Sequence, residues 1–210
     1  MSYAVKEMFL TLQGEGVQAG RRAVFVRFAG CNLWSGREAD RATASCTFCD
    51  TDFVGIDGEG GARFVDASEL ADTVEKFWGD KRVLRYVVLT GGEPMLQIDD
   101  TLIDALHARG FEIGVESNGT IAAHPGIDWL CVSPKAGSDI VQRSGNELKL
   151  VWPQPGSDVE ALESWRFDHF LVQPMDCVDA DGARDAAIAF VMNRPRWRLT
   201  TQTHKMLGLR

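Results

Sequence analysis

Short runs of apolar residues alternate along this chain with segments whose apolar residues recur every three or four positions. The runs predict buried β-strands, and the wider spacing predicts amphipathic helices. The predicted strands are Val24–Ala29, Tyr86–Thr90, Phe111–Ser117, Trp129–Ser133, Glu147–Val151, His169–Gln173 and Trp197–Thr203. The predicted helices are Ser68–Trp78, Ile98–Arg109, Asp158–Trp165 and Ala183–Asn193, and Asp66 with Glu69 has the spacing of a capping box before the first of them.

Strands that alternate with helices indicate an α/β fold, in which parallel strands carry helices on their outer side. The chain has 210 residues, whereas a complete eight-fold barrel usually takes about 250. We therefore predict a partial, open TIM-like barrel. No repeat, low-complexity tract or polar linker divides the sequence, so we expect a single domain over residues 1–210.

Composition and charge exclude several kinds of partner. Apolar residues make up 45% and charged residues 25%, as in an ordinary soluble protein. No apolar run approaches the roughly 20 residues of a membrane span, and Met1–Leu12 lacks a signal-peptide core, so we expect a cytoplasmic protein with no membrane partner. The formal net charge of −8 argues against nucleic-acid binding, because such binding depends on neutralising phosphates.

Three of the five cysteines crowd into residues 31–49, with fourteen residues between Cys31 and Cys46 and two between Cys46 and Cys49. In a reducing compartment such crowding favours metal binding over a disulfide. The residues alone leave three interpretations open: a redox dithiol, a zinc loop with Asp50 or Asp52 as fourth ligand, and a four-iron cluster with one iron left open. Cys131 and Cys177 are predicted to be small buried hydrophobes.

Polar residues follow several of the predicted strands, at the carboxyl-terminal edge where α/β folds place their chemistry. Arg27 differs, because it is a charge inside an apolar strand, and a buried charge needs an anion beside it. A substrate carboxylate would match the guanidinium fork. The alternative is an internal ion pair with Glu15.

Several motifs occur in a fixed order from about residue 9 to the C-terminus: 9-FLTLQGEG-16, 26-VRFAGCNL-33, 46-CTFCDT-51, 89-LTGGEP-94, 116-ESNGT-120, 132-VSPK-135 and 202-QTHK-205. Together they resemble the 7-carboxy-7-deazaguanine synthase family, radical S-adenosylmethionine (SAM) enzymes of the queuosine pathway. One departure is the first cysteine gap, which an insert, Trp34–Ser45, expands beyond the three residues usual in the superfamily.

The resemblance implies a radical SAM barrel with a cluster-binding loop at residues 31–52. It also implies a ring contraction of 6-carboxy-5,6,7,8-tetrahydropterin to 7-carboxy-7-deazaguanine with loss of ammonia. In this family a 5′-deoxyadenosyl radical derived from SAM takes a hydrogen atom from the substrate, SAM is regenerated, and Mg²⁺ assists the rearrangement. The cofactor supplies the radical chemistry, and the protein binds and orients the cofactor and the substrate.

The same resemblance assigns the site residues. Cys31, Cys46 and Cys49 would ligate the [4Fe–4S] cluster, and Thr51 would ligate Mg²⁺. SAM would be contacted by Phe48, Asp50, Gly92, Glu93, Glu116, Asn118, Ser133, Pro134, Lys135 and Gln173. The substrate would be contacted by Leu12, Gln13, Gly14, Glu15, Arg27, Thr90, His204 and Arg210, the last through the terminal carboxylate. For Asn118, a solvated position at a strand end is the alternative to a role at the site.

The resemblance further implies a homodimer and an electron donor such as flavodoxin. Two other functions remain open from the residues. One is a radical SAM activase that acts on a partner protein, and it leaves the segment 13-QGEG-16 and the 202-QTHK-205 ending unexplained. The other is a zinc-bound interaction module, which predicts no SAM binding.

Overall fold

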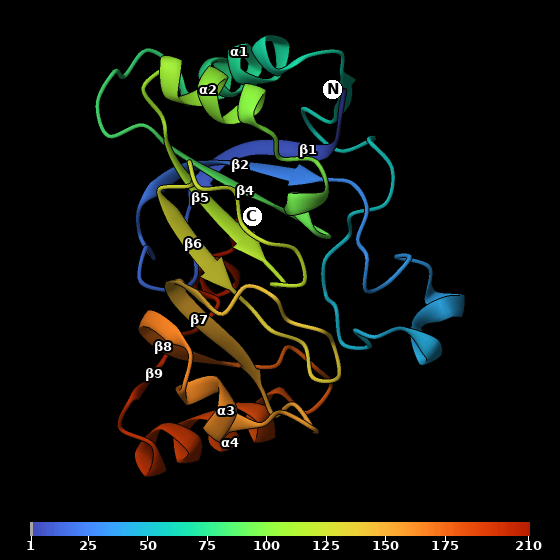
Figure 1. The fold of residues 1–210 in the computed structure, drawn as a ribbon, viewed down its shortest axis with the longest axis vertical. Coiled ribbons are helices and arrows are strands. Elements are labelled where there is room, and N and C mark those ends of the chain that lie inside the picture. The colour runs from blue at the N-terminus through green and yellow to red at the C-terminus, as the bar shows by residue number, and fades with distance from the viewer. Residues whose placement is uncertain (1) are drawn as a thin grey trace.

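The computed structural model describes residues 2–210 (Figure 1), so Met1, the first residue of the expected domain, lies outside the described residues. Nine strands form one sheet in the order β3-β1-β2-β4-β5-β6-β7-β8-β9. Their bounds are β1 Tyr3–Leu12, β2 Arg22–Phe28, β3 Ala62–Phe64, β4 Tyr86–Gly91, β5 Glu112–Ser117, β6 Trp129–Val132, β7 Ser144–Trp152, β8 Arg166–Pro174 and β9 Trp197–Leu199.

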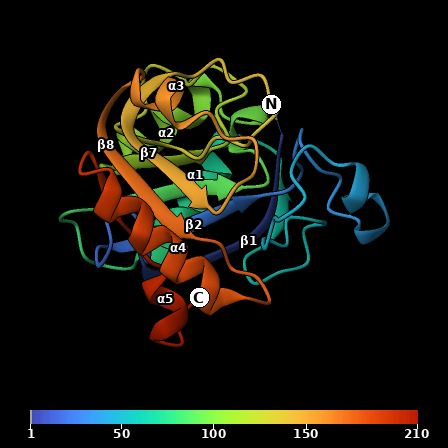
Figure 2. The same ribbon diagram turned by 90° about the horizontal axis from the view of Figure 1, so that it is seen from below.

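The sheet curls but does not close. Strands β2 and β4 to β9 run parallel, and β3 and β9 are the two free edges. Figures 1 and 2 show the strands wrapping around a common interior with helices on the outside. The predicted α/β class and the open, partial barrel are confirmed. The two antiparallel strands β1 and β3 were not predicted as strands.

The helices are α1 Ala67–Trp78, α2 Asp100–Ala108, α3 Val159–Glu163, α4 Ala180–Asn193 and α5 Thr203–Met206, with 3₁₀ turns at η1 Glu38–Thr43 and η2 Pro94–Leu96. All four predicted helices are present. The predicted strand Trp197–Thr203 is wrong in its second half, because the chain leaves the sheet after Leu199 and forms α5.

Aspartates begin the four longer helices at positions that local chemistry explains. Asp66, Asp99, Asp158 and Asp179 each accept a hydrogen bond from the backbone N–H three residues on, which satisfies a donor that the helix leaves free. The Asp66–Glu69 capping box forms in a shifted version, since the carboxylate of Glu69 accepts from the N–H of Val65 at 2.8 Å. The helix α2 starts later than predicted because Asp99 is its cap.

The two faces of each strand bury different cores. Along β2, Val24, Val26 and Phe28 pack in the large outer core beneath the helices, while Ala23 and Phe25 belong to a small inner cluster with Tyr86 of β4. Successive side chains point to opposite faces of a strand, so Arg27 has the inward parity of Phe25.

A bulge in β1 decides what faces Arg27. The pairing of β1 with β2 shifts between Val5 and Glu7. As a result Val5 and Met8 both pack in the outer core, and Glu7 and Phe9 face the interior opposite Arg27 and Phe25. Bulges commonly re-aim a side chain beside a functional site.

Within residues 2–210, no helix combines the length and apolar character that crossing a membrane requires.

Candidate active site

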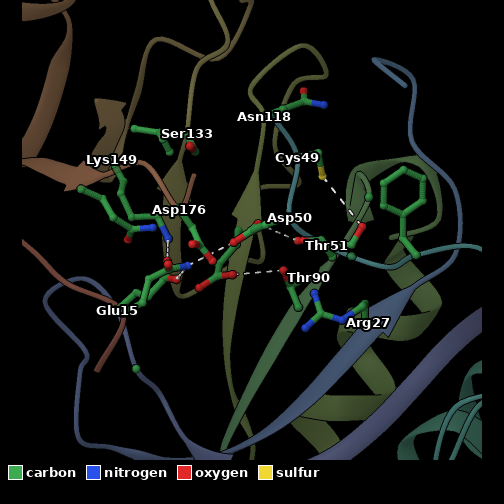
Figure 3. A pocket seen from close by; sticks show the side chains of 18 of the residues that line it. Glu15, Arg27, Cys49, Asp50, Thr51, Thr90, Asn118, Ser133, Lys149 and Asp176 are labelled. Carbon is green, nitrogen blue, oxygen red and sulfur yellow. Dashed lines mark hydrogen bonds and ion pairs between the residues drawn. The ribbon is translucent and has the colours of Figure 1, made fainter. Parts of the chain in front are cut away.

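A cavity of about 350 Å³ opens at the carboxyl-terminal ends of the strands. The predicted site residues that line it are Leu12, Gln13, Gly14, Glu15, Arg27, Cys31, Cys46, Phe48, Cys49, Asp50, Thr51, Thr90, Gly92, Glu116, Asn118, Ser133, Lys135, Gln173, His204 and Arg210. Figure 3 shows labelled members of this set pointing toward a common space. Glu93 and Pro134 are not among the lining residues.

The three clustered cysteines reach the cavity from two directions. Cys31 follows β2, and Cys46 and Cys49 follow the insert. The N–H of Leu33 donates to the sulfur of Cys31 at 3.4 Å, and the thiol of Cys49 donates to the carbonyl oxygen of Thr51 at 3.9 Å. The three sulfurs therefore border one cavity.

The thiols of Cys46 and Cys49 also share a hydrogen bond. It lowers the pKa of Cys49 to about 6 and, together with burial, raises the pKa of Cys46. Burial raises the pKa of Cys31. The pair therefore holds one thiolate near neutral pH, and the second requires a positive charge or metal beside it.

The oxygen ligands suggested for a zinc loop are already engaged. Asp50 forms an ion pair with Lys205 at 2.9 Å, and Asp52 forms one with Lys6 at 2.9 Å. No three His, Cys, Asp or Glu side chains within residues 2–210 converge on one position for a single metal ion. Neither Asp50 nor Asp52 is therefore placed as the fourth ligand of a zinc ion, as the zinc interpretation requires.

Glu93 was predicted to hold the amino group of SAM, but its carboxylate is fully buried. It accepts hydrogen bonds from the hydroxyl of Ser117 at 2.9 Å and from the N–H groups of Asn118 at 2.7 Å and Met95 at 3.0 Å. Burial raises its pKa. Glu93 thus ties the end of β4 to the end of β5, and because it does not border the cavity, its contact with SAM stays a prediction.

The glycines before Glu93 permit a close approach to the cysteine loop. A Cβ atom on Gly92 would stand 2.2 Å from the carbonyl oxygen of Gly30 and 2.7 Å from Cβ of Cys31. The backbone of β4 therefore lies directly against the start of the cluster-binding loop, which only a glycine allows.

Arg27 forms its ion pair with Glu7, whose Oε1 accepts from Nε at 2.8 Å. The alternative pairing with Glu15 is wrong, because the β1 bulge brings Glu7 opposite Arg27. Among the residues that the structure describes, no hydrogen bond occupies the two terminal nitrogens of Arg27. They remain available to an anion in the cavity.

Glu15 instead pairs with Lys149, a residue that the sequence analysis missed. The ammonium of Lys149 donates to Glu15 Oε2, and Gln202 donates to Oε1 at 2.9 Å. Burial alone would raise the pKa of Glu15, but Lys149 and Gln202 hold it below its usual value. The available signal was a charge within an apolar strand, the same signal that identified Arg27.

A second carboxylate, that of Glu116, is held between two neighbours. It accepts from Gln13 at 3.0 Å and from the hydroxyl of Thr90 at 3.0 Å. Glu116 and Glu15 both line the cavity, and their carboxylates are acceptors held in place by neighbouring donors. The side chains that donate to a carboxylate also fix its orientation.

Three further polar groups belong to the SAM side of the predicted site. Lys135 donates to the carbonyl and hydroxyl oxygens of Ser133, both at 2.8 Å, and lies 5.8 Å from the ring centre of Phe48. Burial lowers the pKa of Lys135. Asn118 is buried and donates to Asn32 at 3.0 Å, so the solvated alternative for it is wrong.

The C-terminal segment closes one side of the mouth. His204 lies so close to Gly14 that a Cβ atom there would stand 2.1 Å from Nδ1. Lys205 pairs with Asp50, and the backbone oxygen of Arg210 accepts from Thr11 at 3.0 Å. The sequence analysis named His204 and Arg210 but missed Lys205, because its partner is 155 positions away.

The remaining cysteines differ from each other. Cys131 is buried, as predicted, and it also borders the cavity. Cys177 is exposed in the bend before α4, so its predicted burial is wrong. His107 and His124 pair with surface aspartates, Asp128 and Asp100.

An open parallel barrel with three thiols at its mouth defines a radical SAM protein, and the Radical SAM superfamily model matches residues 40–149. The chain is 63% identical over 210 residues to 7-carboxy-7-deazaguanine synthase of Bradyrhizobium diazoefficiens, covering 100% of both chains. It is 56% identical over 209 residues to the same enzyme of Bordetella pertussis, again covering 100% of both. The chain belongs to the 7-carboxy-7-deazaguanine synthase family.

A solved structure agrees with this assignment. The crystal structure of QueE from Escherichia coli has a TM-score of 0.71 and 26% sequence identity, covering 97% of this chain and 95% of that one. Membership of the superfamily brings a [4Fe–4S] cluster and SAM. The residues fit both groups. The three thiols are soft ligands that border one cavity, and the buried Oε1 of Gln173, which borders the same cavity, has no hydrogen-bond partner among residues 2–210.

Proposed function

We propose that this chain converts 6-carboxy-5,6,7,8-tetrahydropterin to 7-carboxy-7-deazaguanine with loss of ammonia. The observation that carries the proposal is the shared cavity, where three thiols and the polar ends of the strands meet. Full-length identity with named 7-carboxy-7-deazaguanine synthases supports the same reaction.

In this proposal Cys31, Cys46 and Cys49 hold the cluster. When bound, the cluster and SAM supply the radical that starts the rearrangement. SAM is held from the strand ends by Lys135, Ser133 and Gln173. The Oε1 atom of Gln173 has no hydrogen-bond partner among residues 2–210 and can accept a hydrogen bond from SAM. The aromatic ring of Phe48, between two of the thiols, packs beside SAM.

The substrate lies against the inner wall. The free terminal nitrogens of Arg27 bind its carboxylate, because a guanidinium fork matches a planar anion. The ionised carboxylate of Glu15 accepts from the N–H groups of the pterin ring, with Gln13, Gly14, Leu12 and Thr90 along the same edge. His204 contacts the ring from α5, and Arg210, whose backbone oxygen accepts from Thr11, contacts the substrate at the edge of the cavity.

Magnesium belongs to the proposal as well. The hydroxyl of Thr51 lies 3.5 Å from Oδ1 of Asp50 at the cavity wall. Hydroxyl and carboxylate oxygens are the hard donors that Mg²⁺ prefers, and Mg²⁺ usually keeps several waters or substrate oxygens as its other ligands. We assign one Mg²⁺ ligand to Thr51.

A homodimer, a cytoplasmic location and an electron donor such as flavodoxin complete the proposal. The location follows from the chemistry of the thiols, since free cysteines persist in a reducing compartment. A low-potential donor is required because the cluster must be reduced before each SAM cleavage.

The test is an anaerobic assay of the reconstituted protein with SAM, reductant, Mg²⁺ and 6-carboxy-tetrahydropterin, read by mass spectrometry. We expect 7-carboxy-7-deazaguanine to form and to be absent with Cys31→Ala. No protein partner is added, so product formation separates this function from that of an activase.

Two other outcomes contradict parts of the proposal. Cleavage of SAM with the pterin left intact would remove the substrate assignment and retain the radical SAM class. Zinc in place of iron in protein purified without air, with no SAM binding, would favour the interaction module.

A further inference from the structure

One carboxylate near the end of β5 holds two of the proposed substrate contacts. The amide nitrogen of Gln13 donates to Oε1 of Glu116 at 3.0 Å, and the hydroxyl of Thr90 donates to Oε2 at 3.0 Å. All three residues line the cavity, and Gln13 and Thr90 are buried. Gln13 follows β1, and Thr90 lies in β4. Glu116 therefore joins three parts of the barrel at the wall that the substrate meets.

The hydroxyl of Thr90 has only one direction of hydrogen bonding left. A hydroxyl carries one O–H donor and two acceptor lone pairs, whereas an ionised carboxylate only accepts. The single O–H of Thr90 is used on Glu116, so this oxygen can offer only lone pairs to a ligand. A polar group that contacts Thr90 from the cavity must therefore donate, and the ring N–H groups of a tetrahydropterin are donors of this kind.

The side-chain amide of Gln13 is held in one orientation. Its nitrogen donates to Glu116 at 3.0 Å, and its oxygen accepts from the backbone N–H of Glu15 at 3.0 Å. A reversed amide would place its oxygen against the carboxylate and its nitrogen against the N–H, so both bonds would be lost. The amide therefore keeps one N–H and one lone pair for a ligand, both at fixed positions.

We infer that Glu116 is a positioning residue that sets the hydrogen-bonding direction of Thr90 and the orientation of Gln13, and thereby the affinity for the substrate. The inference rests on the proposed function, in which Thr90 and Gln13 contact the pterin. The family resemblance instead gives Glu116 a contact with SAM. The two assignments predict different kinetics, because a positioning role changes KM for the pterin and a contact with SAM changes KM for SAM.

The test variant and its control lie on the same strand. Glu116→Gln keeps the size of the side chain but replaces one acceptor oxygen with a nitrogen that donates, so Thr90 or Gln13 loses its fixed direction. The matched control is Glu112→Gln at the start of β5. Glu112 pairs with Arg21 at 2.8 Å and is not among the residues that line the cavity. Both variants remove one negative charge from β5, and only the first changes the cavity wall.

The experiment measures steady-state kinetics of the reconstituted enzyme with the pterin and SAM varied in turn, and with iron counted in each sample. We expect Glu116→Gln to raise KM for the pterin at least about fivefold, the effect of one lost hydrogen bond. Its KM for SAM and its iron content are expected to stay close to wild type. Glu112→Gln is expected to match wild type in all three measurements.

A double-variant cycle shows whether Glu116 acts through its neighbour. Thr90→Val keeps the shape of the side chain and removes the hydroxyl. We expect Glu116→Gln to raise KM for the pterin less in the Thr90→Val background than in wild type, because the hydroxyl that it would misdirect is already absent. Equal rises in the two backgrounds would overturn the inference.

Other results would overturn it as well. These are a wild-type KM for the pterin in Glu116→Gln, an equal rise in Glu112→Gln, and a change confined to KM for SAM. If Glu116→Gln binds no iron, Glu116→Asp decides, since it keeps the charge but is one methylene too short to hold both neighbours. A wild-type KM for the pterin there overturns the inference. Wild-type protein that cleaves SAM and leaves the pterin intact would instead contradict the proposed function.

Discussion

At the scale of single residues, the site depends on charges buried inside apolar strands. Arg27 of β2 and Lys149 of β7 both point into the barrel, and each meets a glutamate from the β1 side. A buried charge is tolerated only with a partner and hydrogen bonds. The two ion pairs differ in the hydrogen-bonding groups that they leave unoccupied. Among the described residues, the terminal nitrogens of Arg27 have no partner, whereas both carboxylate oxygens of Glu15 accept hydrogen bonds.

Arg27→Lys is expected to lose most of its substrate affinity and to keep its cluster. An ammonium can pair with Glu7 but cannot also present a fork to a carboxylate. We expect KM for the pterin to rise at least about tenfold, corresponding to about 1.4 kcal/mol. Steady-state kinetics give KM, and the absorption spectrum of the cluster is the control. Unchanged Michaelis behaviour would contradict the assignment.

Lys149→Met is expected to destabilise the fold by about 3–5 kcal/mol, the usual cost of removing one partner of a buried pair. The double variant Glu15→Gln/Lys149→Met removes both charges and is expected to be more stable than Lys149→Met. Urea unfolding of the protein without cofactors measures both. Purely additive losses from the two single variants would show that the pair is not coupled.

At the scale of elements, caps and the bulge explain which side chains reach the site. The start of α2 shows how an element is anchored. Asp99 accepts from the N–H of Leu102 at 3.0 Å and from the hydroxyl of Tyr3 at 2.6 Å, which ties the helix to β1. The bulge in β1 then turns Glu7 toward Arg27. The cap of α1 at Asp66 was readable from the sequence, whereas the cap of α2 at Asp99 was missed and the bulge depends on cross-strand pairing.

The Asp99 contact predicts a pH-dependent contribution to stability. Burial would raise the pKa of Asp99, but its hydrogen bonds from Tyr3 and Thr101 lower it below its usual value of 3.8. A group with a lowered pKa in the folded state stabilises the protein above its unfolded pKa, and the contribution is lost as pH falls through the folded pKa. Asp99→Asn keeps the cap oxygen and loses the charge.

We therefore expect Asp99→Asn to be less stable than wild type by about 1 kcal/mol at neutral pH. The difference should disappear as pH falls below about 4. Denaturant midpoints across this range measure it. A difference that persists at low pH would contradict the role of the charge.

The Tyr3–Asp99 hydrogen bond also loses its contribution to stability at high pH, when the hydroxyl of Tyr3 ionises. Burial, followed by the bond to Asp99, raises the pKa of Tyr3 to about 12, from 10.0. A raised pKa contributes stability below the unfolded pKa that is lost as pH rises through the folded value. The advantage of wild type over Tyr3→Phe is therefore expected to fall between pH 10.0 and about 12. Thermal unfolding of both proteins across that range checks it.

At the scale of the whole molecule, segments far apart in sequence share one mouth. The insert after β2, the loop after β8 and the segment that contains α5 all contribute residues that line the cavity. Lys205 joins two of these regions, since it pairs with Asp50 and Asp176. The C-terminal segment therefore contributes to the site without belonging to the barrel core, because none of the residues of α5 is buried.

Removal of residues 203–210 is expected to leave the barrel folded and to impair substrate binding. The sheet ends at Leu199, and the lost residues include His204 and Lys205. We expect normal iron content, little change in circular dichroism and a rise in KM for the pterin of at least about tenfold. Wild-type KM would contradict the role of the C-terminal segment, and loss of the fold would contradict its independence from the core.

The sequence by itself determined the four longer helices, the parallel strands β2 and β4 to β9 and the presence of three clustered thiols, because these follow from the spacing of nearby residues and from the kinds of side chain present. The class of chemistry came from the ordered motifs that resemble the 7-carboxy-7-deazaguanine synthase family, since the cysteines alone left three interpretations open. Only the tertiary structure decided that Arg27 meets Glu7, that Lys149 meets Glu15 and that Glu93 is withdrawn from the cavity. Those contacts depend on the register between paired strands and on segments that are far apart in the sequence but lie around one cavity. Neither can be predicted from local periodicity.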